Sequence, residues 1–332
     1  MTENRCVALL LIAVACFTQA LRAEMVTVGN PGNASDSNGF GAVSYTFRIS
    51  RYEFTNAEYV RFLNAVDPTG VNLYQIYSTE MTTNSRGGIL LNVNESVGQK
   101  SSSKENMGNK PVNFVGWREA ARVANWLHNG QGPGGTETGA YALNGSVAGD
   151  GLGAPARSLD ALYWIPTEHE WYKAAYYNPE AQNGYFNFAT QSDATPSATL
   201  ADSNGNGIAG PLGNFANLDD GAAWNGQIGN LTTVGTNGSS SYYGTYDQTG
   251  NVAEWNDRLG EANVNKGVRG GDWSGFTGAS AGSRYQFAVG TENSRLGFRL
   301  ASSVPEPGSL VLMSVAGFGF VFKRLRRMKK HR

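Results

Sequence analysis

Apolar residues recur every three or four positions in three separate stretches, a spacing typical of helices with one buried face. In the first stretch, YEFTNAEYVRFLNAV at 52–66, Thr55 and Glu58 form a T-x-x-E capping box. Such a box satisfies free backbone amides at the start of a helix. The pattern therefore predicts a helix that begins near Asn56.

Two further helices are predicted along the chain. PVNFVGWREAARVANWLHNG at 111–130 predicts a helix from about Trp117 that ends at an Asn-Gly pair. LYWIPTEHEWYKAAYYNP at 162–179 contains a second capping box, formed by Thr167 and Glu170. Its helix should end at the Asn-Pro pair, because the residue before a proline disfavours the helical conformation.

The segments between and after the helices are rich in turn-forming residues. Residues 70–110 and 131–160 are polar and Gly-rich, which predicts surface loops, and 180–300 favours loops with short strands. The 43 glycines agree with many tight turns. The pattern therefore predicts an α+β, irregular and loop-rich single domain.

Two segments outside the helices favour strands. Alternation across 43–49 predicts one strand, and GFRL at 297–300 predicts a last strand with Phe298 or Leu300 in the core. Arginines near these blocks should be buried and paired with acids, because an unpaired buried charge is costly. We expect Arg269 and Arg299 to pair with carboxylates such as Glu170 or Glu254. Tryptophans of the predicted core are Trp117, Trp164, Trp171, Trp255 and Trp273.

Charge is distributed unevenly along the chain. Hydrophobic residues make up 40% of the sequence, enough for a packed core, and the formal net charge is −1. Seven of the last ten residues are Lys or Arg. Without residues 1–23 and these last ten, the body carries 17 basic and 26 acidic residues, a net charge of −9. An acidic body excludes nucleic acid as the expected partner, because phosphates require the opposite sign.

Residues 1–23 have the layout of a secretory signal peptide. An apolar run of 11 residues, 7–17, follows Arg5 and is shorter than the roughly 20 residues that a membrane-spanning helix needs. Small residues at Ala20 and Ala23 give two cleavage positions, between which the sequence does not decide. A buried N-terminal helix is the alternative interpretation.

Residues 304–332 combine a Pro-Glu-Pro sequence, an apolar stretch at 310–322 and a dense basic cluster. Basic residues stay on the cytoplasmic side, so the apolar stretch would stall in the inner membrane during export. The arrangement resembles the PEP-CTERM sorting signal of Gram-negative bacteria. The resemblance implies an exosortase-type protease as partner and delivery to the cell surface or extracellular matrix. We expect transient membrane anchoring through 308–322, with an ordinary tail anchor as the alternative.

Both cysteines of the chain, Cys6 and Cys16, lie inside the predicted signal peptide. The exported body at 24–303 therefore contains no cysteine. It can form no disulfide, although its destination is oxidising. It also offers no thiol nucleophile and no thiolate metal ligand.

Five sequence blocks, taken in order, resemble the formylglycine-generating enzyme (sulfatase-modifying factor) family. Together they extend over roughly 25–301, nearly all of the exported body. The resemblance implies a mixed α+β, loop-rich fold related to the C-type lectins. The blocks are YEFTNAEYVRFL at 52–63, PVNFVGWREAARVANWL at 111–127, IPTEHEWYKAA at 165–175, GNVAEW at 250–255, and RGGDW at 269–273 with GFRLA at 297–301.

In that family two cysteines bind copper(I), which suits soft thiolates, and activate oxygen to oxidise a substrate cysteine. The resemblance places these cysteines near Thr277 and Gly282, and Asp272 replaces the serine of the RGGSW block. Neither Thr277 nor Gly282 can bind copper as a thiolate. We therefore expect no copper and no catalytic residue. A cysteine-independent oxidase, or another enzyme activity in the same cleft acting on exported proteins, remains the alternative.

The resemblance also implies structural calcium sites, built from the oxygen ligands that calcium prefers. Asn251 and Glu254 match one site in the GNVAEW block. Asn217 matches a second site together with the carbonyl of the next residue, and Asn225 is a weaker match. The alternative is that Asn251 caps a turn and Glu254 pairs with an arginine.

The segment 274–296 should form the face that binds a glycan or protein ligand. Tyrosine and tryptophan favour such faces, because they combine a rigid apolar surface with a polar edge. We expect Trp273, Phe276, Tyr285 and Asn293 to contact this ligand. The sequence therefore favours an exported, non-catalytic binding module, and identifies neither its ligand nor its oligomeric state.

Overall fold

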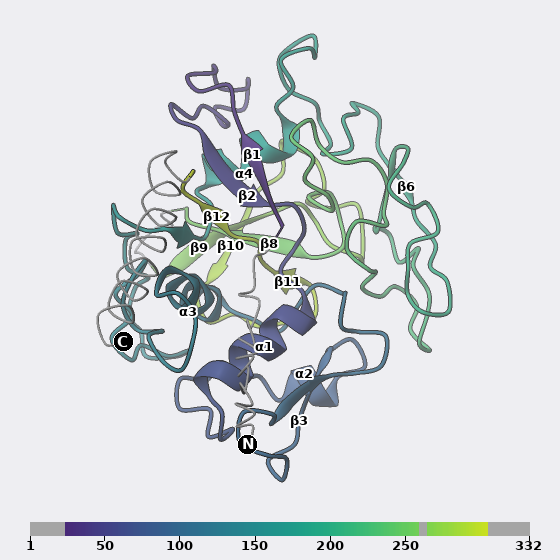
Figure 1. Ribbon diagram of the computed structural model, residues 1–332. Coiled ribbons are helices and arrows are strands. Elements are labelled where there is room, and N and C mark those ends of the chain that lie inside the picture. Colours follow the sequence, from purple (N-terminus) through teal and green to yellow (C-terminus); the bar gives the residue numbers. More distant parts are fainter. Residues whose placement is uncertain (1–23, 259–263, 305–332) are drawn as a thin grey trace, which may run out of the picture.

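The computed structural model describes residues 24–258 and 264–304, so the predicted signal peptide at 1–23 and the sorting tail beyond Val304 lie outside the described residues. No helix within these described ranges is long and apolar enough to cross a membrane. Figure 1 shows a few short helices and small sheets connected by long loops. The helices are α1 Asn56–Val66, α2 Glu80–Thr83, α3 Trp117–His128 and α4 Glu168–Tyr176.

The three predicted helices are confirmed as α1, α3 and α4. In α1, the Thr55 hydroxyl accepts from the Glu58 amide, and the Glu58 carboxylate accepts from the Thr55 amide. Thr167 and Glu170 form the same reciprocal pair at α4. Helix α3 begins at the predicted residue without a side-chain cap. Both capping boxes therefore mark helix starts correctly.

One four-stranded sheet joins the two ends of the domain. Its order is β1-β2-β12-β5, all antiparallel, with β1 Met25–Val28, β2 Phe47–Ser50, β12 Ala301–Ser302 and β5 Tyr163–Trp164. The predicted strand at 43–49 is therefore correct only in its second half. Its first half turns away because the Val43 amide donates to the Asn33 side chain and the Val43 carbonyl accepts from Gly32.

A second four-stranded sheet carries the candidate site. Its order is β10-β9-β8-β11, from β10 Tyr285–Ala288, β9 Asn265–Arg269, β8 Ala253–Asn256 and β11 Leu296–Gly297. The β11–β8 pair is parallel and the other pairs are antiparallel. Strand β10 forms one edge of this sheet, and all four of its residues are exposed. The predicted last strand is thus divided between β11 and β12.

The prediction of a surface loop at 70–110 is only partly correct. This segment contains α2 and a hairpin of β3 Ile89–Leu91 with β4 Ser101–Ser103. Met81 and Ile89 are buried in the main core. The Asn56 amide group of α1 donates to the carbonyls of Met107 and Lys110, which holds the segment against the helix. The local spacing of apolar residues does not predict this contact between α1 and the segment.

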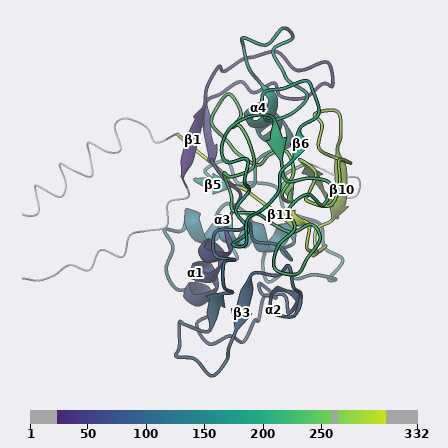
Figure 2. The same ribbon diagram turned by 90° about the vertical axis from the view of Figure 1, so that its right-hand side faces the viewer.

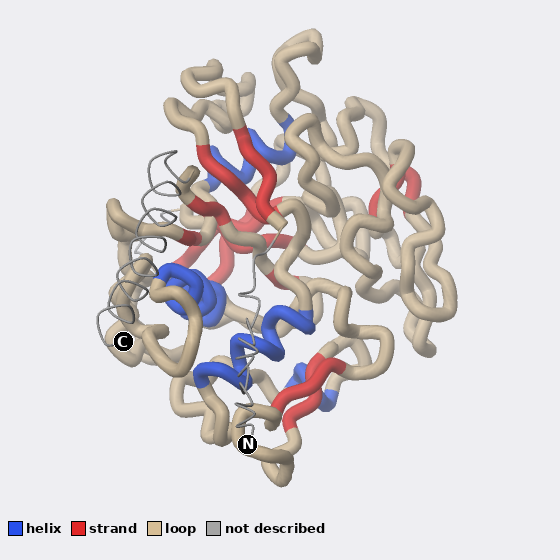
Figure 3. The backbone as a smooth tube through the Cα atoms, viewed as in Figure 1, coloured by secondary structure: helices blue, strands red, loops and turns tan. Residues whose placement is uncertain are grey.

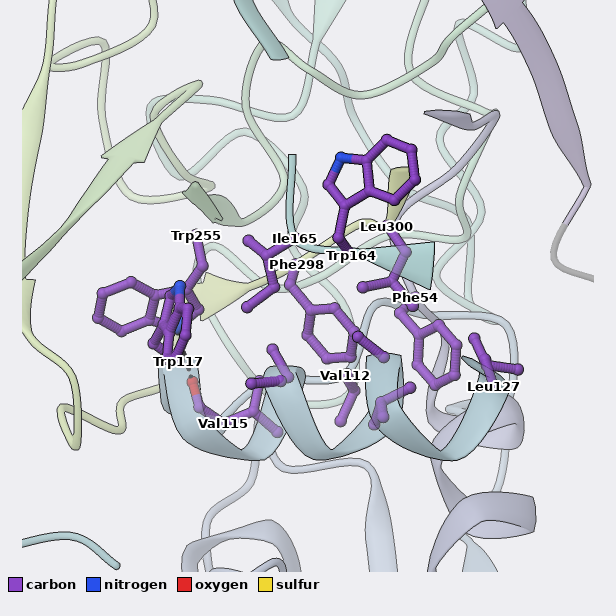
Figure 4. Packing of buried hydrophobic residues seen from close by; sticks show 14 of the residues in the cluster. Phe54, Val112, Val115, Trp117, Leu127, Trp164, Ile165, Trp255, Phe298 and Leu300 are labelled. Atoms are coloured by element: carbon purple, nitrogen blue, oxygen red, sulfur yellow. Dashed lines mark hydrogen bonds between the residues drawn. The ribbon is translucent and has the colours of Figure 1, made fainter. Parts of the chain in front are cut away.

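Helix α3 lies under the centre of the main core. Figure 4 shows apolar side chains of the chain segments on either side meeting above this helix. Phe54 and Phe298 stack with ring centroids 5.0 Å apart, and Trp255 donates to the Val115 carbonyl at 3.0 Å. Both Phe298 and Leu300 are fully buried. The predicted core tryptophans are confirmed as buried: Trp117, Trp164, Trp171, Trp255 and Trp273.

The part of the chain between α4 and β8 consists mostly of loops, as Figure 3 shows. Its regular structure is a two-residue parallel pair, β6 Ser197–Ala198 with β7 Phe215–Ala216. Buried side chains substitute for a ladder of backbone bonds here: the Asn217 amide donates to the Asn230 carbonyl and to the side chains of Thr232 and Asn251. Such bonds satisfy buried polar groups where sheets are absent.

Candidate functional site

A cavity of about 290 Å³ opens beside β9 and β10. Its floor comes from β8, β9 and β11, and its rim comes from the loops before β10 and before β11. The lining residues share no single chemistry, because apolar, aromatic, acidic and basic side chains alternate around it. They are Ala253, Val268, Arg269, Gly271, Asp272, Ser274, Gly275, Thr277, Tyr285, Phe287, Asn293, Arg295 and Leu296.

The predicted ligand-binding face coincides with this cavity, although its four predicted contact residues divide into two groups. Tyr285, 42% exposed, and Asn293 line the cavity. Phe276 is exposed outside the lining. Trp273 is only 7% exposed: Arg86 stacks on its ring at 4.2 Å, and its indole donates to the Ser294 carbonyl. The ring of Trp273 therefore supports the rim from behind.

The two positions at which the resemblance places cysteines lie differently. Thr277 lines the cavity, whereas Gly282 is exposed outside it. Asp272, in the serine position of the block, accepts from both the amide and the hydroxyl of Ser274, at 3.0 and 2.6 Å. Arg295 lies 3.4 Å from that hydroxyl. The cavity therefore offers a carboxylate, a hydroxyl and a guanidinium beside two aromatic rings.

Asn251 and Glu254, the first predicted calcium pair, have different partners. The side-chain oxygen of Asn251 accepts from the Asn217 side chain and from the backbone amide of Thr232, both at 3.0 Å. The Glu254 carboxylate accepts two bonds of 2.6 Å from Arg299 and one of 2.8 Å from Trp171. The predicted Arg299–Glu254 pair is thus confirmed, and it occupies the oxygens that a cation would need.

Two further acids surround Arg299, and no sequence pattern indicated either of them. We call Glu53, Asp247, Glu254 and Arg299 the acid-rich cluster. Burial raises the pKa of Glu53 well above its usual range, and the charges of Asp247 and Glu254 raise it further. Burial also raises the pKa of Asp247. Internal donors reach these acids, since Asn251 donates to Glu53 at 2.7 Å and the Asn237 amide to Asp247 at 2.8 Å.

The two side chains of the second predicted calcium site lie in different surroundings. Asn217 is fully buried, and its side-chain oxygen has no hydrogen-bond partner. Asn225 does not join it, because Asn225 sits exposed at a positive φ of 52° in the Trp224–Gln227 turn. Asn230, also fully buried, lies beside Asn217 with an unpartnered amide nitrogen. Within the described ranges, no group of three or more His, Cys, Asp or Glu is placed to hold a metal.

The buried Arg269 pairs with an acid that the sequence did not indicate. Its nearest carboxylate is Glu168, the first residue of α4, at 2.8 Å, and the prediction of Glu170 or Glu254 was wrong for this arginine. Glu170 instead pairs with Arg157 at 3.3 Å and accepts from the Trp164 indole. A carboxylate in the first turn of a helix is a known favourable position, which is the one local signal for Glu168.

Several solved structures are similar to this chain at low sequence identity. One of these structures is "Treponema denticola variable protein 1", which has 18% identity and a TM-score of 0.44 over 84% of this chain and 95% of that chain. "Crystal Structure of CarF" has 20% identity and a TM-score of 0.48 over 86% and 99%. "Structure of PvdO from Pseudomonas aeruginosa" has 18% identity and a TM-score of 0.43 over 86% and 93%. A search of curated proteins finds no match.

Family models give the stronger result. The PEP-CTERM protein-sorting motif matches residues 303–327, which indicates export and sorting through an exosortase-type system. The Sulfatase-modifying factor enzyme 1-like domain matches residues 28–304, which include all the described strands except β1 in full. Because this match extends over most of the sequence, the chain belongs to the family of sulfatase-modifying factor enzyme 1-like domains.

Proposed function

We propose that this exported protein binds a glycan or protein ligand at the cell surface or in the extracellular matrix, and that it does not catalyse copper-dependent oxidation. The observation that carries the proposal is the cavity beside β10. Thr277 lies in its wall where the family resemblance places a cysteine, and the exported body contains no cysteine. A threonine hydroxyl is a poor ligand for copper(I), which prefers soft sulfur.

The composition of the cavity suits recognition. Tyr285 and Phe287 expose aromatic rings on an edge strand, and Asp272 and Asn293 add polar groups next to them. Aromatic faces pack against the apolar faces of sugars or side chains, while the polar groups fix orientation. The two aromatic and two polar side chains therefore provide both contact area and direction.

Binding can be tested with two tyrosines of similar exposure. Tyr285 lines the cavity and is 42% exposed, whereas Tyr242 is 40% exposed and lies outside the lining. On a glycan array and in pull-downs from envelope extracts, Tyr285→Ala should lose at least tenfold in affinity, and Tyr242→Ala should keep it. Equal binding by both variants would remove the cavity from the proposal.

Catalysis is tested separately. The purified protein is incubated with copper, oxygen and a cysteine-containing peptide, and the peptide is examined by mass spectrometry. We expect no aldehyde product and no stoichiometric copper. Product formation that Thr277→Ala abolishes would support the alternative, a cysteine-independent oxidase of this family, and would refute the binding-only function.

We also propose that calcium, if bound, is held at Asn217 rather than at Glu254. The unpartnered side-chain oxygen of Asn217 fits an oxygen-ligated cation, whereas the Glu254 oxygens are taken by Arg299. Neutral ligands give weak affinity, because charge count sets calcium binding strength. Millimolar calcium should raise the melting temperature, and Asn217→Ala should abolish that rise. An unchanged rise in Asn217→Ala would place calcium elsewhere.

A further inference from the structure

Three arginines converge on one buried carboxylate at the start of α4. Glu168 accepts from Arg269 at 2.9 Å and from Arg284 at 3.0 and 2.6 Å, and Arg258 approaches it at 3.9 Å. We call these four residues the arginine-rich cluster. Three guanidinium groups against one carboxylate leave an excess of two positive charges. Within the described residues, no other acid lies within ion-pair distance of these arginines.

The strand register forces two of these charges together. Tyr285 pairs with Val268 between β10 and β9, so the residues next to them, Arg284 and Arg269, lie opposite each other. Like charges directly opposite on neighbouring strands are destabilising. Phe40 relieves part of this cost, since both guanidinium groups contact its ring, at 4.6 and 4.7 Å. The ring offers attraction to cations but no counter-charge.

Hydrogen-bond donors of the cluster remain unused. The buried Arg269 has one terminal nitrogen, Nη2, that forms no hydrogen bond, although it lies near Glu168. Arg258 forms no hydrogen bond with any described residue, and its side chain is 28% exposed. Arg284 is 34% exposed. The first backbone amides of α4 add partial positive charge at the same place, because the helix begins at Glu168. Charge and donors therefore both point to an anion with several oxygens.

We propose that the arginine-rich cluster binds an oxyanion of an acidic polysaccharide, a carboxylate or a sulfate group. Arginine forks suit such planar or tetrahedral oxyanions. Arg269 also lines the cavity, in which Tyr285 and Phe287 present aromatic faces to sugar rings. A polysaccharide can occupy both features at once, whereas a nucleic acid would meet the acidic body of the protein. The proposal extends the proposed ligand-binding function by giving the ligand a charge.

Calorimetric titration of the full chain at low salt tests the proposal, with polygalacturonate, heparin, dextran and polyglutamate as probes. Polygalacturonate or heparin should bind, and the first is carboxylated while the second is sulfated, so the preferred probe identifies the oxyanion. Dextran, which is neutral, should not bind. Binding of polyglutamate as tight as that of both polysaccharides would overturn the polysaccharide assignment in favour of an acidic peptide.

Charge-removing variants locate the site. Arg258→Gln and Arg284→Gln should each weaken acidic polysaccharide binding about threefold to tenfold. The matched control is Arg51→Gln, because Arg51 is 35% exposed and pairs with a single acid, Glu24. The Arg51→Gln variant should bind the acidic polysaccharide with unchanged affinity. Arg258 has no hydrogen bond to lose within the described chain, so Arg258→Gln will fold even if Arg284→Gln does not. Equal affinity of Arg258→Gln and Arg51→Gln would overturn the proposal.

The same variants distinguish a failure of the anion site from a failure of the proposed ligand-binding cavity. If Tyr285→Ala retains acidic polysaccharide binding while the arginine variants lose it, the anion site stands and the cavity does not contribute. If Tyr285→Ala and the arginine variants both lose binding, both proposals are supported. If inorganic sulfate raises the melting temperature of Arg51→Gln but not of Arg258→Gln, the anion site is supported without any polysaccharide.

Discussion

The acid-rich cluster and the arginine-rich cluster are opposite solutions to the same problem of buried charge. In the first, three acids surround Arg299; in the second, three arginines surround Glu168. Each cluster has an imbalance of two charges. They differ in access, since the acids and Arg299 are all buried, whereas Arg258 and Arg284 reach the surface.

The difference indicates separate roles. Backbone and amide donors from the surrounding loops reach Glu53 and Asp247, so the fold itself supplies what the acids lack. The arginines retain unused donors at the surface, and the described residues supply no second acid to them. A buried ionic group costs more when it loses its partner than when it is satisfied internally. The acid-rich cluster is therefore structural, and the arginine-rich cluster faces a ligand.

The largest effect should come from the fully enclosed cluster. Arg299→Met removes the one cation beside Glu53, Asp247 and Glu254, and we expect a loss of about 3–5 kcal/mol in the free energy of unfolding. Urea unfolding followed by fluorescence measures this loss. The control is Arg295→Met, an exposed arginine whose removal should cost less than about 0.5 kcal/mol. Equal losses would mean that burial does not separate the two kinds of arginine.

A buried acid outside both clusters, Glu119, should make the stability of the protein depend on pH. Burial, and after it the charge of Glu292, raises the pKa of Glu119 to about 7, although Arg122 opposes both effects. Because the folded pKa lies above the usual 4.5, the folded protein holds the extra proton between these values. Stability is therefore full below pH 4.5 and falls as pH rises through 7, by up to roughly 3 kcal/mol.

Glu119→Gln should remove this contribution. Unfolding free energies measured from pH 4.5 to 8 should fall less steeply for the variant than for the wild type, and the raised pKa values of Glu53 and Asp247 should leave a smaller slope in the variant. An equal slope in the wild type and in Glu119→Gln would mean that Glu119 does not hold the extra proton.

The stability of a variant in the arginine-rich cluster should depend on which anion the salt supplies. Glu168→Gln leaves three arginines without an acid, and we expect a loss of about 2 kcal/mol, because two of them can turn to solvent. Sodium sulfate should restore part of this loss at an ionic strength where sodium chloride does not. Glu254→Gln, the matched change in the acid-rich cluster, should show no sulfate effect. Recovery of both variants by sulfate would make the effect a general one of salting-out.

The smallest effect separates helix capping from anion binding. Thr167→Ala removes the cap of α4 and Thr55→Ala that of α1, and each should cost about 1 kcal/mol in unfolding experiments. Since α4 begins at Glu168, only Thr167→Ala should also weaken acidic polysaccharide binding, about twofold. A twofold loss in Thr55→Ala would show that capping acts through overall stability alone.

Local signals explain which elements were predictable. A capping box within four residues predicts each of the helices α1 and α4, and the spacing of apolar residues predicts α3. Strands β11 and β12 could not be separated, because only their partners, β8 and β2, distinguish them. The segment 70–110 was predicted as a surface loop because the polar contacts that bury it come from Asn56, a residue far from most of it.

The candidate site follows the same rule. The segment 274–296 was located by the family resemblance, and its Tyr285 and Asn293 line the cavity. Trp273 is buried behind the rim, and composition does not show which side of an irregular loop faces inward. The pairing of Arg269 with Glu168 joins residues 101 positions apart, and no spacing rule reaches that far.

The position of β12 has a consequence for how the domain is held. Strands β1 and β12 belong to one sheet, and Arg51 donates its backbone amide to Glu24, so both ends of the described domain leave from that sheet. Figure 2 shows β1 and β10 on opposite sides of the molecule. A tether attached after β12 would therefore hold the domain on the side opposite β10. The β10 cavity would then face away from the point of attachment and be accessible to other molecules.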